Sequence, residues 1–445
     1  MASRLGGNHD GSTLSGEPSS KPEIQASEAT LYILRQKNIT YMKKYLTLMA
    51  AAWLLVGCTS DEVVNPQGGD LDGAILFDVA GMAETRAPGM MDLDGTTQPV
   101  SLQDKGFGVF ASYTALEKYE TATVSTDFMY NQGVTYYDDG AGNTGWTYSP
   151  VKYWPNYTDD RDKEYVSFFA YAPYEADPQD DGRCIFAVSK NFNYGDPWVN
   201  YRLAENPWDT DPAKQQVDLC FGMHQDGTNF TPWTDQCKAD YDIDDKLKFT
   251  FKHALACIGD QISIKMADDL WSTINGYATV TIDKVTITYK NLTTKARLVL
   301  NSADGTPNWK EIISGELTCS RTITLDNTTT GGVIPFTFDD TNHGTDNLLS
   351  DQFGLLFIPL QIAGTEAATA EVAAEYTVVN NASETYNGVA KGTFKLLENA
   401  GVPYTLDPGQ KNAIRITLTK DFDLAHLVYP LGGGSGSGPS YVKKH

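Results

Sequence analysis

The residue types that most often carry out chemistry do not gather into a known constellation in this chain. Its six histidines form no HExxH or HxH pair, and none stands at metal-ligand spacing from a cysteine. Neither a GxSxG nucleophile turn nor a GxxxxGK(S/T) phosphate loop occurs. His253, beside an apolar run, is more typical of a hydrogen-bonded histidine at a strand end than of a metal ligand. The sequence therefore predicts neither an enzyme nor a metal or cofactor site.

One cysteine stands in a pattern that predicts a modification. Lys43 and Lys44 precede the short apolar stretch 45–56, which is too short to span a bilayer comfortably and is typical of a signal peptide. The residues Leu-Val-Gly then lead to Cys58 and match a bacterial lipobox, in which the cysteine thiol takes a diacylglyceryl group. We therefore predict export and a lipid on Cys58. The alternative is an ordinary signal peptide with an incidental cysteine.

The residues around this segment predict how the mature chain begins. Met42 stands directly before the two lysines, so we expect residues 42–58 to be the signal peptide and residues 1–41 to be a non-native upstream extension. Residues 59–73 have the composition of a flexible tether. The acidic pair that follows the cysteine resembles the signal that sends Bacteroidetes lipoproteins to the outer face of the outer membrane. A plain solvated linker is the alternative.

Charge and cysteine content narrow the class of protein. The chain has 57 acidic and 34 basic residues, a formal net charge of -23, and no basic patch with interleaved aromatic residues. Such a surface repels nucleic acid, so we expect no nucleic-acid partner. Without Cys58, five cysteines remain, and an odd number cannot all pair within one chain. Their spacing leaves open whether any two form a disulfide.

Short runs of alternating and β-branched residues recur from about residue 74 to residue 420 and are separated by turn signals. They predict an all-β protein of two antiparallel β-sandwich domains in tandem. The clearest run is 277–289, in which Asp283 and Lys284 shift the alternation and indicate a bulge. An acidic segment near 235–246 suggests a boundary, which gives domains at 74–240 and 241–430 and a Gly/Ser-rich tail at 431–445.

Five segments, in their order behind the lipobox, resemble the fimbrillin family, the fimbria-subunit lipoproteins of Bacteroidales. Each segment is weak alone, but together they cover nearly the whole mature chain. The segments are AILFDVA with the later Thr85-Arg86-Ala87 step, FGVFA at 107–111, YWP with YVSFFAYAPY at 153–174, FTFKHALA at 249–256, and PGQKNAIRITL at 408–418.

The resemblance implies transthyretin-like domains and assembly by strand exchange. In that scheme an arginine-specific protease cuts after Arg86, and Ala87 becomes the new N-terminus. The strand at 74–80 leaves, and a strand from another fimbrial subunit fills its groove. Ile75, Phe77 and Val79 alternate along the leaving strand and are the expected groove plugs. An ordinary loop arginine is the alternative for Arg86.

The resemblance also implies a place on the cell surface, in the outer membrane before processing and in a fimbria afterwards. In shaft subunits of the family, C-terminal strands are the donors, whereas the last residues here are short and basic. The role as shaft, tip or anchor subunit therefore stays open. The alternative is a non-polymerising surface lipoprotein that binds glycan or protein through exposed aromatic residues, unless these pack in the core. The candidates are Trp146, Tyr153, Trp154, Trp198 and Trp208.

Overall fold

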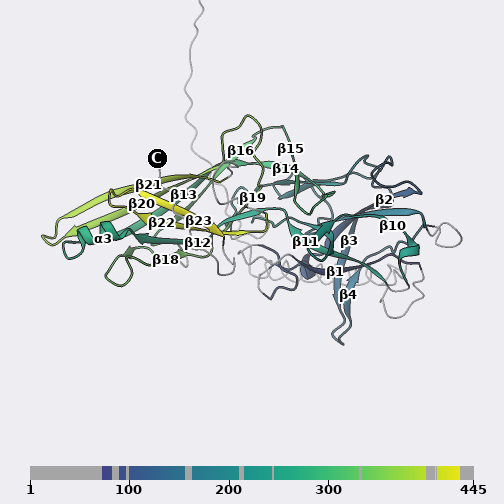
Figure 1. Cartoon of the computed structure of the whole chain (residues 1–445), viewed down its shortest axis with the longest axis horizontal. Coiled ribbons are helices and arrows are strands. Elements are labelled where there is room, and N and C mark those ends of the chain that lie inside the picture. The colour runs from purple at the N-terminus through teal and green to yellow at the C-terminus, as the bar shows by residue number, and fades with distance from the viewer. Residues whose placement is uncertain are drawn as a thin grey trace, which may run out of the picture. The chain divides into compact units, whose positions relative to one another are not determined.

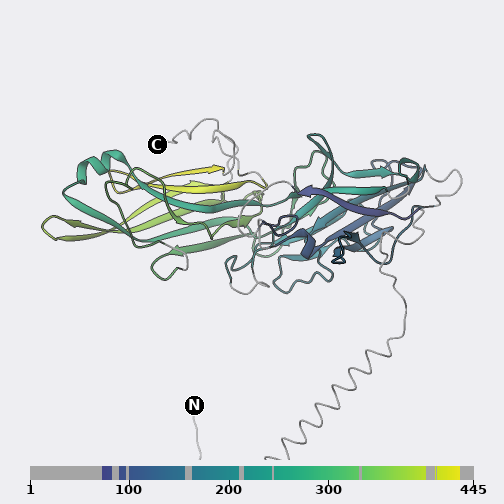
Figure 2. The same ribbon diagram turned by 90° about the horizontal axis from the view of Figure 1, so that it is seen from below.

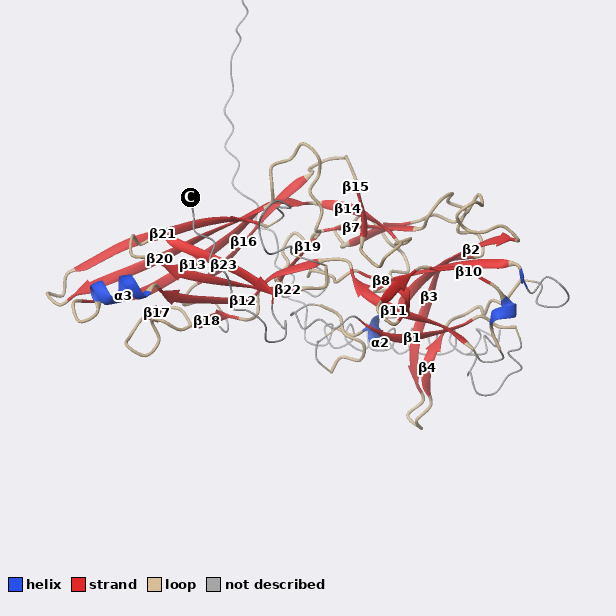
Figure 3. Ribbon diagram, viewed as in Figure 1, coloured by secondary structure: helices blue, strands red, loops and turns tan. Residues whose placement is uncertain are grey.

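The described part of the protein consists almost entirely of strands joined by turns and loops (Figures 1 and 3). Its helices are short: α2 (Leu102–Lys105), α3 (Asp268–Ile274) and the 3-10 turn η2 (Lys238–Asp240). The predicted all-β class is confirmed. The computed structural model describes residues 73–82, 90–96, 100–155, 163–209, 215–242, 245–329, 333–396, 406 and 408–430. The predictions for Cys58, Arg86, Ala87, the extension, the signal peptide and the tail lie outside the described residues.

The largest sheet has nine strands and contains the first strand of the described residues. Its main path runs in the order β1 (Leu76–Met82), β11 (Lys246–His253), β8 (Cys220–Asp226), β5 (Tyr165–Ala172), β2 (Phe107–Ala115), β3 (Met129–Asp138) and β4 (Thr144–Thr147). Two short strands lie off this path: β10 (Trp233–Gln236) pairs with β5, and β9 (Asn229–Thr231) pairs with β8.

Three smaller sheets complete the described fold. The first joins β15 (Asn308–Glu311), β14 (Lys295–Val299), β7 (Trp198–Arg202) and β6 (Ile185–Val188). The second joins β18 (Asn347–Ser350), β12 (Ala256–Met266), β22 (Lys411–Leu418) and β23 (Leu424–Pro430), with β19 (Leu355–Phe357) on β12. The third joins β16 (Thr318–Leu325), β13 (Ala278–Thr293), β20 (Thr369–Asn380) and β21 (Thr385–Lys395), with β17 (Phe336–Thr337) on β13.

Strand direction is mostly antiparallel, as predicted, but two pairs are parallel. β1 runs parallel to β11, and β12 runs parallel to β22. Both pairs join strands that are far apart in the sequence, and alternation along a strand carries no information about its neighbour's direction. Several strands after residue 241 also pair with strands before it: β11 pairs with β8, and β14 pairs with β7. The domain boundary at residues 240 and 241 remains a proposal.

The central strands β5 and β2 of the nine-stranded sheet are buried on both faces, which explains why their sequences are nearly continuous apolar runs. Along β5, Phe168 enters one hydrophobic cluster and the adjacent Phe169 enters another. In β2 the same division separates Val109 from Phe110. The first cluster, which we call the β1 core, also contains Ile75, Phe77, Phe107, Trp146, Tyr148, Trp154, Phe249 and Phe251.

β13 shows the irregularity that its sequence predicts. The register of its pairing with β20 shifts between Ile282 and Lys284. The extra residue keeps the apolar side chains of Ile282 and Val285 buried on either side of the shift. The five cysteines of the described chain are all free thiols. Among the described residues, no helix is both long and apolar enough to cross a membrane.

Candidate functional site

The predicted leaving strand forms β1, which lies at one end of the main path of the nine-stranded sheet. Figure 2 shows β1 as the purple arrow. It pairs in parallel with β11, from Leu76 opposite Lys246 to Met82 opposite Phe251. The register shifts between Val79 and Gly81. Of the strands in the described chain, β11 is the one that forms a ladder with β1.

The residues just before β1 are held from the other side by the segment that follows β4. Ala74 and Tyr153 form an antiparallel bridge. The Ile75 N–H donates to the Lys152 carbonyl at 2.9 Å, and the Trp154 N–H donates to the Gly73 carbonyl at 2.8 Å. Since β4 is the far end of the sheet path, these bonds bring the two ends of the path together around the β1 core.

Tyr148 reinforces this junction. Its hydroxyl donates to the Ile75 carbonyl at 2.8 Å and accepts the Lys152 N–H at 3.1 Å. Burial raises the pKa of the Tyr148 phenol above its ordinary value, so the hydroxyl keeps its proton and stays a donor. One side chain thereby ties the start of β1 to the segment after β4.

The three predicted plug residues differ in burial. Ile75 and Phe77 are fully buried, whereas Val79 is half-buried against the same cluster. The Phe77 ring centroid lies 5.3, 5.9 and 6.0 Å from those of Tyr148, Phe168 and Phe249. Aromatic rings at these separations attract one another beyond the burial of their area. Phe77 therefore fills a site formed by the rings of Tyr148, Phe168 and Phe249. The role of plug itself stays a proposal.

Arg86 lies outside the described residues, but the chain on either side of it is described. Before it, Met82 is paired with Phe251 at the end of β1. After it, Met90 and Met91 are both buried, and the Met91 N–H donates to Asp218 Oδ2 at 2.9 Å. The predicted cleavage point is thus bracketed by two segments that are fixed on neighbouring strands of one sheet.

Asp218 belongs to a buried polar cluster that no sequence motif revealed. His253 and Cys220 are opposite each other in the β11–β8 pair. Asp218 Oδ2 lies 2.6 Å from His253 Nδ1 and 3.7 Å from Cys220 Sγ, and that sulfur lies 3.4 Å from His253 Nδ1. Burial, and then the Asp218 charge, raise the pKa of the Cys220 thiol well above its ordinary value, which favours a protonated thiol.

These three side chains are of the types that bind zinc, so the distances decide between a metal site and a hydrogen-bonded cluster. Oxygen and nitrogen ligands of one tetrahedral zinc ion lie about 3.3 Å apart, because each lies about 2.0 Å from the metal. The 2.6 Å between Asp218 Oδ2 and His253 Nδ1 is instead the length of a strong hydrogen bond. The geometry supports the hydrogen-bonded strand-end histidine that the sequence predicts, and identifies its partner.

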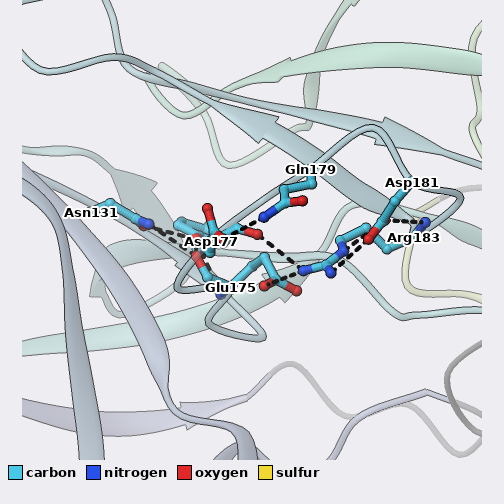
Figure 4. Close-up of polar contacts among 7 residues, drawn as sticks. Asn131, Glu175, Asp177, Gln179, Asp181 and Arg183 are labelled. Atoms are coloured by element: carbon cyan, nitrogen blue, oxygen red, sulfur yellow. Dashed lines mark hydrogen bonds and ion pairs between the residues drawn. The ribbon is translucent and has the colours of Figure 1, made fainter.

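A second polar cluster orders the connection from β5 to β6 (Figure 4). Arg183 forms paired hydrogen bonds with Asp181 and contacts Glu175 Oε1 at 2.9 Å. The Glu175 carbonyl accepts a bond from Asn131 Nδ2. The hydrogen bond from Arg183 lowers the pKa of Asp181 below its usual range. Because the ion pair between Arg183 and Asp181 is largely exposed, it contributes little stability. The guanidinium of Arg183 is already paired within the loop.

The aromatic residues that were candidates for solvent exposure differ in burial. Trp146 and Trp154 are buried in the β1 core, and Trp208 is half-buried against the other cluster, so the core-packing alternative holds for these three. Trp198 is half-buried. Tyr153 is the exception, with 47% of its surface exposed. Larger exposed fractions occur at four aromatic residues that the sequence reasoning did not single out as exposed, at positions 192, 194, 277 and 386.

Comparisons with known proteins agree with this description. No protein-family model matches the chain. A stretch of 194 residues is 29% identical to fimbrium subunit Fim1C of Phocaeicola vulgatus, over 42% of this chain and 45% of that protein. The chain thus matches about half the length of this relative. The crystal structure of a fimbrial protein from Bacteroides vulgatus aligns with 78% of this chain and 99% of its own, with a TM-score of 0.53 and 21% identity.

The likeness to the solved structure defines the class of protein by its fold, a fold shared with a bacterial fimbrial protein. The match to the fimbrium subunit and the five sequence segments together support the predicted family. On these findings the chain is similar to a fimbrium subunit in part of its sequence and to a fimbrial protein in its fold.

Proposed function

We propose that this protein is a structural or adhesive subunit of a cell-surface fimbria that is exported as a lipoprotein precursor. A lipid on Cys58 holds the precursor in the outer membrane. An arginine-specific protease cuts between Arg86 and Ala87, β1 leaves, and a strand from another subunit replaces it. The observation that carries the proposal is β1 itself. It lies at the end of a sheet path, and Phe77 in β1 and Ile75 just before it are both buried in the core.

Loss of β1 would create a strong acceptor for another strand. The edge of β11 would lose its ladder partner, and the rings of Tyr148, Phe168 and Phe249 would lose Phe77. Full burial of one Phe or Ile side chain is worth about 1.5–3 kcal/mol, so the open groove is costly. An incoming strand restores both the backbone bonds and the burial, which is the basis of strand addition.

The residues after the cut would stay in place when β1 leaves. Met90 and Met91 are buried, and Asp218 accepts the Met91 N–H. These contacts are separate from the β1–β11 ladder, so they survive its loss. The new N-terminus would therefore start only a few residues from a fixed point on the sheet, and the groove would open without unravelling the strands behind it.

The processing step can be tested on the purified full chain with an arginine-specific protease. We expect a product that begins at Ala87 and then forms oligomers, seen by N-terminal sequencing, light scattering and electron microscopy. Arg86→Lys keeps the charge but removes the cleavage specificity, so it should stay monomeric. Arg183→Lys, at a half-buried arginine in another loop, is the control and should assemble. Normal assembly of Arg86→Lys would refute the processing proposal.

The lipid anchor has an independent test in cells. Cells grown with labelled palmitate should incorporate label into the wild-type precursor, and the protein should fractionate with membranes. Cys58→Ser should lose the label and the membrane association. A secreted wild-type chain without label would instead support an ordinary signal peptide. If the chain is labelled and never cut, the alternative of a non-polymerising surface lipoprotein that binds glycan or protein gains support.

A further inference from the structure

The hairpin loop between β6 and β7 exposes two aromatic side chains close together in the sequence. Phe192 is 65% exposed and Tyr194 is 77% exposed. Single exposed apolar residues are common on soluble proteins and need no explanation. Two large rings within three residues of one loop are a more specific feature. We call residues 190–196 the aromatic loop.

Backbone bonds fix the middle of the aromatic loop to the segment 124–126. Tyr194 forms an antiparallel bridge with Ser125. On either side of this bridge, the Gly195 N–H donates to the Val124 carbonyl at 3.0 Å, and the Thr126 N–H donates to the Asn193 carbonyl at 3.3 Å. The loop is thus paired like a short strand around Tyr194, whose side chain is exposed.

Side chains fix both ends of the aromatic loop. At one end, the buried Thr126 hydroxyl donates to the Lys190 carbonyl at 2.8 Å. At the other end, Asp196 Oδ1 accepts bonds from the Tyr119 hydroxyl and from Asn301 Nδ2, each at 2.9 Å. Elements from three other parts of the chain therefore hold the loop in one conformation, and its exposed rings are preorganised rather than free to collapse.

Phe192 also occupies a backbone conformation that its side chain disfavours. Its φ angle is 55°, in the left-handed region that suits glycine and is a clear outlier for a bulky residue. The side chain gains little from packing, since most of it is in water. Neither backbone preference nor core packing therefore accounts for phenylalanine at this position. Strained residues that persist in this way concentrate at ligand-binding sites.

We propose that the aromatic loop is a carbohydrate-binding site in which Phe192 and Tyr194 stack against the apolar faces of pyranose rings. A Phe or Tyr side chain presents about 150–250 Å² of surface, whereas each partner in a stable protein–protein interface buries about 800 Å². Two rings therefore match one or two sugar units and are too small for a protein partner. The exposed Lys190 and Asn191 beside them supply donors and an amide for sugar hydroxyls.

The site can be tested on the full, uncleaved chain, so the result does not depend on cleavage at Arg86. The probe is an immobilised array of defined neutral and acidic pyranose oligosaccharides. We expect the wild type to bind a subset, and Phe192→Ala and Tyr194→Ala each to weaken binding at least about fivefold, as the loss of one aromatic contact implies. Tyr194→Phe should retain binding. Tyr277→Ala, at a residue 71% exposed in another loop, is the control and should bind normally.

A glycine substitution separates a binding role from a structural one. Phe192→Gly should relieve the backbone strain and raise the melting temperature by about 1–4 °C, while binding falls as in Phe192→Ala. A residue kept for folding would lower the melting temperature when replaced. The proposal is overturned if no oligosaccharide binds, if the Phe192→Ala/Tyr194→Ala double variant binds like the wild type, or if Phe192→Gly destabilises the fold.

Discussion

The hydroxyl of Tyr148 lies 2.8 Å from the carbonyl oxygen of Ile75, and this hydrogen bond joins the first strand to the segment that follows β4. The same ring lies 5.3 Å, centroid to centroid, from Phe77. One buried tyrosine therefore holds the start of β1 by a polar contact and a plug residue by an apolar contact. The two contacts can be removed separately.

Tyr148→Phe removes the polar contact and keeps the ring. We expect the free energy of unfolding to fall by about 1–3 kcal/mol, because the buried Ile75 carbonyl and Lys152 N–H both lose a partner. Cleaved β1 should also dissociate faster. Denaturant unfolding and the release rate of the N-terminal fragment measure the two effects. Tyr153→Phe, at an exposed neighbour, is the control, and equal losses for both variants would contradict the role of Tyr148.

Phe77→Ala tests the apolar contact. Removal of a fully buried aromatic ring typically costs about 3–5 kcal/mol, since the lost burial is combined with a cavity. Val79→Ala should cost much less, because Val79 is half-buried. Equilibrium denaturation of the uncleaved chain gives both values. A loss of similar size for the two variants would show that the β1 core does not depend on the Phe77 ring.

Asp218→Ala should both destabilise the chain and loosen the residues after the predicted cut. Its carboxylate is buried and hydrogen-bonds to the Met91 N–H and to His253 Nδ1, so its removal breaks two buried hydrogen bonds at once. We expect a loss of about 3 kcal/mol or more. An aminopeptidase should then trim the cleaved product past Met91, while the processed wild type resists. Asp226→Ala, at an exposed carboxylate in β8, should change neither the free energy of unfolding nor the resistance to the aminopeptidase.

The buried carboxyl of Asp260 should make the stability of the fold depend on pH. Burial raises the pKa of this carboxyl above 3.8, and the opposing effect of Lys411, at 3.3 Å, is smaller. A raised carboxyl pKa in the folded state means that folding favours the protonated form. Stability from this group is therefore greatest below pH 3.8 and falls as pH rises through the raised pKa.

Asp260→Asn mimics the protonated carboxyl at every pH. The variant should therefore gain stability relative to the wild type as pH rises above 3.8, and the difference should level off once Asp260 is fully ionised. Urea unfolding of both proteins from pH 3 to pH 7 measures this difference, and carboxylates common to both proteins cancel in it. A variant that becomes relatively less stable over this range would show that the Lys411 pair outweighs burial.

Local pattern predicted the features of this protein that depend on neighbours in sequence. Alternation of apolar residues identified β13 and several other strands, although β3, β4 and β7 were not predicted, and the break at Asp283 and Lys284 identified the bulge in β13. The position of His253 after an apolar strand indicated a hydrogen bond rather than a metal. Each of these properties follows from backbone geometry or from burial of one face, both of which operate over a few residues.

Pattern could not predict which distant segments meet. The partner of His253 is Asp218, 35 residues earlier, and it was missed. Trp146 and Trp154 were candidates for solvent exposure with core packing as the alternative, and the structure buries both. An aromatic residue can satisfy either environment, so its exposure depends on what the rest of the chain places over it.

The sequence by itself determined the all-β class, the lipobox pattern before Cys58 and the resemblance to the fimbrillin family, because these depend on residue type and short spacing. Only the tertiary structure decided that β1 runs parallel to β11 and that Ile75 and Phe77 enter the core while Val79 is half-buried. It also left Phe192 and Tyr194 in solvent. These outcomes depend on contacts between segments that are far apart in the sequence, and such contacts form only when the sheet has assembled.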